Sequence, residues 1–103
     1  MRKLRKGEIW SLGGAAPGLA IVITANMFNE LPDHPFVLAM DVQPGVVEDQ
    51  LLAVQVVDGK YFAEVDSVGR VPKELFRDLI SGPVDTQVVT DLQNRLFRIL
   101  ALN

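Results

Sequence analysis

The chain of 103 residues has no cysteine, a single histidine and no long apolar run. Without cysteine it has neither a disulfide framework nor a thiolate metal site. Its longest apolar segment, residues 19–25, is far shorter than the roughly 20 residues of a membrane-spanning helix. Basic residues open the chain, but no hydrophobic stretch follows them as in a signal peptide. We therefore expect a soluble, cytoplasmic protein without a cofactor, a metal or a membrane contact.

Positive charge is also scarce, because 10 Lys and Arg face 13 Asp and Glu and give a formal net charge of −3. Nucleic-acid binders normally have an excess of Lys and Arg, so this balance argues mildly against a dedicated one. The distribution is uneven, since four of the basic residues lie within the first six positions: Arg2, Lys3, Arg5 and Lys6. This local positive patch is either an ordinary solvated terminus or a contact for an anionic partner.

Apolar residues are abundant, at 49 % of the chain, and predict one domain over residues 1–103 with a single core. Alternating or β-branched apolar runs predict strands within about residues 7–71. The run at 19–24 is apolar at nearly every position, which predicts a strand buried on both faces. Asp58-Gly59 lies between two β-rich runs and predicts a hairpin, because both residue types tolerate positive φ.

The tail of the chain changes from a strand period to a helical period. Pro72 suits the first turn of a helix, and four apolar residues that follow share one helical face: Leu75, Phe76, Leu79 and Ile80. This pattern predicts a helix over about 72–80. Asp85 can cap a second helix over about 85–100, on which Phe97 either widens the buried face or meets a partner subunit. Strands first and a helix last indicate a mainly β fold, either a small barrel or a strongly bent sheet.

Several motifs occur in the order that is typical of one known family. They are Arg-Lys-Gly-Glu-Ile-Trp at 5–10, the apolar strand 21–24, Asn-Met-Phe-Asn at 26–29, the apolar strand 37–40 with Gln43 to Gly45, and Ala-Glu-Val-Asp at 63–66. In this order and spacing they resemble the MazF/PemK/Kid toxins over nearly the whole chain. The resemblance implies an SH3-like, CcdB/PemK-like β-barrel with short helices and a C-terminal α-helix. It also implies a homodimer that is neutralised by a cognate antitoxin peptide.

The resemblance further implies the toxin of a type II toxin-antitoxin system, a metal-independent endoribonuclease that cuts single-stranded RNA. In that reaction the 2′-hydroxyl attacks its own phosphate, so the protein supplies a base, an acid and positive charge. By position, Asp66 matches the family's aspartate, while Gln43 or Val42 stands in the place of its threonine. The candidate contacts for RNA are Arg5, Lys6, Asn26 and Arg70.

The sequence departs from the family where the family carries its positive charge. Residues 15–19 hold no Arg or Lys in place of the family's arginine, and Glu64 reverses the charge of an arginine found in some members. A carboxylate and an amide alone cannot rebuild an electropositive site. Either the charge comes from the N-terminal basic residues or Arg70, or the protein binds a protein or nucleic-acid partner without cleaving RNA. A structural barrel unrelated to toxins is a third interpretation.

Each candidate also has a plain structural explanation. Asp66 suits a turn in which it bonds nearby backbone amides, and Asn26 suits a capping or turn role. Trp10 and Phe36 are typical of core packing, with base stacking in a groove as the alternative. His34 is typical of a solvated loop residue.

Overall fold

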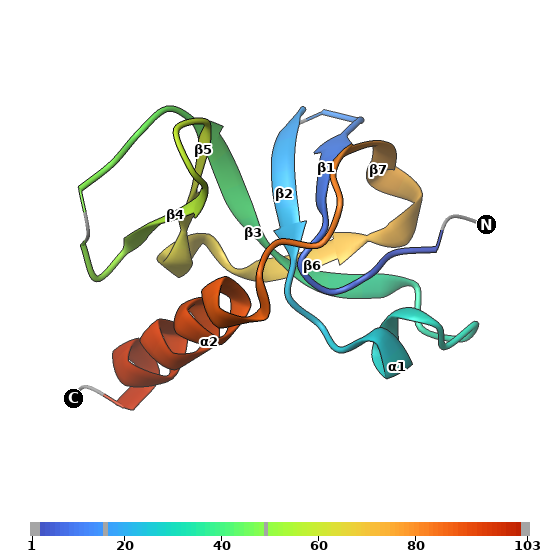
Figure 1. The fold of residues 1–103 in the computed structure, drawn as a ribbon. Coiled ribbons are helices and arrows are strands. Elements are labelled where there is room, and N and C mark those ends of the chain that lie inside the picture. Colours follow the sequence, from blue (N-terminus) through green and yellow to red (C-terminus); the bar gives the residue numbers. More distant parts are fainter. Residues whose placement is uncertain (1–2, 16, 49, 102–103) are drawn as a thin grey trace.

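The computed structural model describes residues 3–15, 17–48 and 50–101 (Figure 1). It contains seven strands, which are β1 (Ile9–Leu12), β2 (Gly18–Val22), β3 (Phe36–Pro44), β4 (Ala53–Val57), β5 (Tyr61–Glu64), β6 (Gly69–Pro72) and β7 (Phe76–Ser81). The helices are α1 (Asn26–Asn29), the 3-10 turns η1 (Val65–Ser67) and η2 (Lys73–Leu75), and the C-terminal α2 (Thr86–Ala101). The predicted mainly β fold with short helices and a C-terminal helix is confirmed.

All strand pairs are antiparallel and form one sheet in the order β4-β5-β3-β2-β1-β7, with β6 attached to β3. Strand β3 organises this sheet. Its first half, residues 36–39, pairs with β6, and its last residues, 42–44, pair with β5. Because two different strands share one edge of β3, the sheet bends strongly (Figure 1).

Strand β2 contributes to two apolar cores on opposite faces of the sheet. Ile21 packs with Met40 and with Leu92 of α2 in the first core, which also contains the β4–β5 hairpin. Ala20 and Val22 belong to the second core, whose other buried members are Leu4, Trp10, Val37, Ala39 and Phe76. This alternation confirms the prediction of a strand buried on both faces. Each large apolar side chain buried in this way contributes about 1.5–3 kcal/mol.

Two local predictions from turn and cap chemistry are confirmed. The hairpin predicted at Asp58-Gly59 joins β4 and β5, and of the two turn residues only Gly59 adopts a positive φ, of +73°. The amide N–H of Gln87 donates to Asp85 Oδ1 at 2.8 Å and so caps the start of α2, which lies within one residue of the predicted helix. Phe97 is 75 % exposed and therefore does not widen the buried face of α2.

The predicted helix over 72–80 is wrong. After β6, residues 73–75 form the turn η2, and residues 76–81 form β7, which pairs with β1. Phe76 is 1 % exposed, whereas Leu79 and Ile80 are 49 % and 41 % exposed, so the apolar residues do not share one buried face. A nine-residue helix is marginal without tertiary support, and pairing with the free edge of β1 satisfies the backbone instead. Strands therefore extend beyond residue 71.

No helix among the described residues combines the length and the apolar character needed to cross a membrane.

Candidate functional site

A small cleft opens where β3 ends and β2 begins. Its volume is about 290 Å³, and it is lined by Leu12, Pro17, Gly18, Leu19, Asp41, Val42, Gln43 and Pro44. We call it the β3-end cleft. Asp41 and Gln43 are the only described lining residues whose side chains carry hydrogen-bonding groups, and none of the described lining residues is basic. The cleft holds the predicted catalytic residue Gln43 but no cation that would attract a phosphate.

Asp66, the other predicted catalytic residue, lies in the turn η1 between β5 and β6 and does not line this cleft. The turn is tied to β3 through Ser67, whose Oγ accepts from the Asp41 amide at 2.7 Å and donates to the Glu64 carbonyl at 2.6 Å. Ser67 therefore makes the turn contacts that the sequence had suggested for Asp66. Within the described residues, the exposed Asp66 carboxylate has neither a hydrogen bond nor an ion pair.

Carboxylates gather around this end of β3. Ala63 pairs with Val42, which places Glu64 at the register position next to Asp41. Asp66 follows in η1 and does not line the cleft, whose only acidic lining residue among those described is Asp41. Like charges repel a phosphate group, and the repulsion grows as the distance shortens. No group of three or more His, Cys, Asp or Glu within the described chain is arranged to hold a metal ion that would offset this charge.

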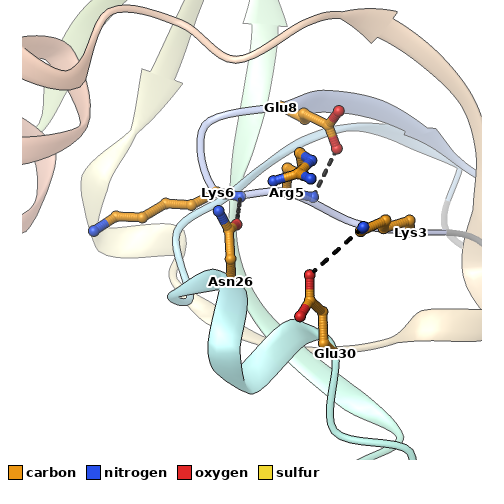
Figure 2. Close-up of polar contacts among 6 residues, drawn as sticks. All are labelled: Lys3, Arg5, Lys6, Glu8, Asn26 and Glu30. Atoms are coloured by element: carbon orange, nitrogen blue, oxygen red, sulfur yellow. Dashed lines mark hydrogen bonds and ion pairs between the residues drawn. The ribbon is translucent and has the colours of Figure 1, made fainter.

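Three of the four predicted RNA contacts lie together beside α1 (Figure 2). The amide of Lys6 donates to Asn26 Oδ1, and the amide of Arg5 donates to Glu8 Oε1, both at 2.7 Å. Glu8 is only 6 % exposed and also accepts from Trp10 Nε1 at 3.1 Å, so it anchors the N-terminal segment to the core. Asn26 thus has a structural role, but it holds the Lys6 amide from 20 residues away instead of capping α1 or forming a turn, and Figure 2 shows the Lys6 side chain extending away from its neighbours. Arg2 lies outside the described residues.

The fourth predicted contact, Arg70, lies on β6 opposite Leu38, at the other half of β3 from Gln43. Its guanidinium carbon lies 4.7 Å from the centre of the Phe36 ring, in cation–π geometry. The structure therefore places Gln43 near the end of β3, Arg70 opposite its first half, and Asp66 in the turn η1 that bonds β3 at Asp41 between them.

A larger groove of about 670 Å³ lies where the loop before β3 meets η2 and the start of β7. It is lined by Pro32, His34, Pro35, Phe36, Pro72, Lys73, Glu74, Phe76 and Arg77. We call it the β6–β7 groove. None of the six predicted site residues lines this groove. The sequence did not suggest Lys73 and Arg77 as neighbours of the loop before β3, because both were expected on a helix over 72–80. The groove exists only because β6 pairs with the first half of β3. Of the residues that line the groove, the sequence analysis had singled out only Phe36 and His34.

Neither a protein-family model nor a curated protein matches the sequence. Solved structures, in contrast, are similar over nearly the whole chain. An endoribonuclease from a mycobacterial species shares 14 % identity, with 99 % of this chain and 95 % of that chain covered and a TM-score of 0.80. A mycobacterial endoribonuclease in complex with its cognate antitoxin shares 14 % identity over 97 % of both chains, with a TM-score of 0.78. MazE–MazF from Deinococcus radiodurans shares 13 % identity over the full length of both chains, with a TM-score of 0.73.

These similarities confirm the resemblance that the sequence motifs suggested. The chain has the fold of the MazF-type endoribonuclease toxins, although few of its residues are the same. At 13–14 % identity, what is shared is the fold.

Proposed function

We propose that the protein is the toxin of a type II toxin-antitoxin pair and acts on single-stranded RNA in the cytoplasm. The observation that carries this proposal is the fold, which follows that of a mycobacterial endoribonuclease over 99 % of the chain. One similar structure contains a cognate antitoxin and another is a MazE–MazF complex. We extend the proposal to a cognate antitoxin peptide as partner and to a homodimer as the working unit.

The proposed chemistry is metal-independent cleavage at an atypical site. The exposed carboxylate of Asp66 is available to take the proton of the 2′-hydroxyl as its oxygen attacks the adjacent phosphorus. The amide of Gln43 has donors for a phosphate oxygen, while the bond from phosphorus to the 5′-oxygen of the next nucleotide breaks and that oxygen takes a proton from water. Because no described residue lining the β3-end cleft is basic, the positive charge comes from outside it. Arg5, Lys6 and Arg70 are the candidates that the sequence suggested.

The test is incubation of the purified protein with a long single-stranded RNA in EDTA. We expect cleavage that persists in EDTA and that Asp66→Ala slows by about 100-fold or more, as expected when a general base is lost. Asp33→Ala is the matched control, because Asp33 is also an exposed acidic residue but lies in the loop before β3. Absence of cleavage, or equal rates for the wild type and Asp66→Ala, would exclude the enzymatic form of the proposal.

A second candidate function is a toxin-fold protein that binds its partner without cleaving RNA. The lining of the β3-end cleft favours it, since its only charged residue among those described, Asp41, cannot stabilise the negative charge of a phosphorane-like transition state. Purification of the tagged protein from its native host separates the two functions. A stoichiometric protein partner without RNA supports the binding function, and recovery of RNA without a protein partner contradicts it.

A further inference from the structure

We propose that the β6–β7 groove, rather than the β3-end cleft, is the main binding site for single-stranded RNA on this chain. The choice of RNA as the ligand rests on the proposed function, but the groove does not depend on cleavage. Sites for single-stranded nucleic acid combine basic groups that follow the phosphates with aromatic faces on which bases stack. The groove offers both kinds of group, whereas the β3-end cleft offers neither.

The charges of the two hollows differ in sign. Lys73 and Arg77 line the groove beside His34, and Glu74 is its only acidic lining residue among those described. The β3-end cleft has Asp41 and no described basic residue. The formal net charge of the chain is −3, so most of its surface repels a polyanion. The cations of this groove attract one instead.

The two cations of the groove are held by contacts to neighbouring segments. The guanidinium of Arg77 lies against Gly13, so closely that a Cβ atom at Gly13 would sit 2.3 Å from Arg77 Nε. Lys73 Nζ donates to the carbonyl of Leu31 at 3.0 Å, which ties the loop before β3 to the wall of the groove. Side chains that are already positioned lose less conformational entropy when a ligand binds.

Aromatic surface lies next to these cations. Phe36 lines the groove, and the Arg70 guanidinium covers its ring at 4.7 Å. His34 lines the same groove and meets Phe28 edge to face, with ring centroids 5.9 Å apart. A phenylalanine and a histidine held in fixed orientations provide faces on which successive bases stack without sequence preference.

An extended peptide fits this groove less well than RNA. Peptides are commonly recognised through free backbone donors at a sheet edge. Three of the lining residues are prolines, Pro32, Pro35 and Pro72, which have no N–H group. The amides of His34, Lys73 and Phe76 already donate to the carbonyls of Leu31, Pro35 and Lys73, respectively. The polar groups left for a ligand are mainly side-chain cations, which suit phosphates.

The experiment measures binding of a fluorescein-labelled single-stranded RNA of about 12 nucleotides, within the range of sites for single strands. Fluorescence anisotropy is recorded in EDTA over a series of salt concentrations. We expect Arg77→Ala to weaken binding about fivefold or more and to reduce the slope of log K against log salt by about 0.7, the value for one lost phosphate contact on a single strand. Arg98→Ala is the matched control, because Arg98 is an exposed arginine on α2 outside the groove, and it should change neither quantity.

Two further variants separate position from charge. Gly13→Ala displaces the flexible end of Arg77 without removing its charge, so it should weaken RNA binding while thermal unfolding changes little. Phe36→Leu keeps an apolar side chain but removes the ring, so it should weaken binding about fivefold without changing the salt slope. Circular dichroism verifies that each variant is folded.

The outcomes distinguish this inference from the proposed function. RNA binding that depends on Arg77 and Phe36, without cleavage, supports the groove and overturns the enzymatic proposal. Cleavage by a protein whose RNA affinity is unchanged in Arg77→Ala and Gly13→Ala overturns the groove and keeps the enzyme. If only Arg5→Ala or Lys6→Ala abolishes RNA binding, the assignment of RNA to the β6–β7 groove is also overturned. Binding of a polyglutamate peptide that depends on Arg77, with no binding of RNA, would assign the groove to an acidic peptide instead.

Discussion

The two hollows beside strand β3 differ in almost every property except their closeness to the same strand. The β3-end cleft lies at residues 41–44 and carries an amide, a carboxylate and no described basic side chain. The β6–β7 groove lies at the other end of β3, next to Phe36, and carries Lys73 and Arg77. The resemblance to the toxin family predicts a site residue in the cleft, Gln43, whereas positive charge favours the groove as the binding site for an anion. The comparison shows that one strand supports two hollows whose charged lining residues differ in sign.

The residues that specify the fold and the residues predicted to form the site differ in their exposure to solvent. The residues that specify the fold, such as Ile21, Val22 and Met40, are fully buried in the two cores. Asp41, Gln43 and Asp66 are exposed. Exchanging an exposed side chain typically changes stability by less than about 0.5 kcal/mol, so the chemistry of a surface site can change while the core remains.

The largest expected effect concerns the floor of the β6–β7 groove. Phe76 is 1 % exposed and meets Trp10 edge to face, with ring centroids 6.3 Å apart. Phe76→Ala should lower the free energy of unfolding by about 3–5 kcal/mol, because it opens a cavity in the second core. Phe97→Ala, at a 75 % exposed position on α2, is the control and should change it by less than about 0.5 kcal/mol. Urea denaturation measures the change in the free energy of unfolding for both variants. Similar changes would show that Phe76, and with it the floor of the groove, is not part of the stabilising core.

The next effect concerns the missing charge of the β3-end cleft. A Cβ atom at Gly18 would have no neighbour within 4 Å, so an arginine there has room at the start of β2. If cleavage takes place in the cleft and lacks positive charge, Gly18→Arg should raise the rate of RNA cleavage about tenfold or more. Gly18→Gln is the uncharged control. A rate unchanged by Gly18→Arg would mean that the cleft is not the place of the reaction.

The smallest effect compares one residue from each region. Arg70→Ala removes the cation over Phe36 and with it one positive charge beside the groove, so we expect RNA affinity to fall about two- to fivefold. Gln43→Ala should leave the affinity unchanged, because Gln43 lies in the cleft. Anisotropy with the same labelled RNA measures both. The reverse order would place the bound RNA in the β3-end cleft.

Much of the fold was predictable from local patterns. The apolar run in β2, the Asp58-Gly59 turn and the start of α2 at Asp85 each combine residue types that favour one conformation. The segment 72–80 was not predictable in this way. Its apolar spacing suits a helix, but β1 offers an unpaired edge, and strand pairing satisfied more of the backbone than a short helix would. Tertiary pairing outweighed the local pattern there.

The candidate site was predictable only in part. The chain order suggested Asp66 and Gln43, and the structure places Gln43 in the β3-end cleft and Asp66 in the turn η1, outside the lining of that cleft. The same reasoning named Arg70 without indicating that it covers Phe36, and it placed Lys73 and Arg77 on a helix. Whether these side chains meet depends on which strand pairs with β3, which is a long-range contact that spacing along the chain does not reveal.

The sequence by itself determined the strand-rich architecture, the hairpin at Asp58-Gly59, the C-terminal helix and the shortage of positive charge where the toxin family has it. Those features follow from residue type and local spacing, which act over a few neighbouring residues. Only the tertiary structure decided that residues 76–81 are a strand, that β3 supports two hollows of opposite charge, and that Arg77 lies across Gly13. These features come from contacts between residues far apart in the chain, and the free energy of such contacts depends on packing that no local pattern records.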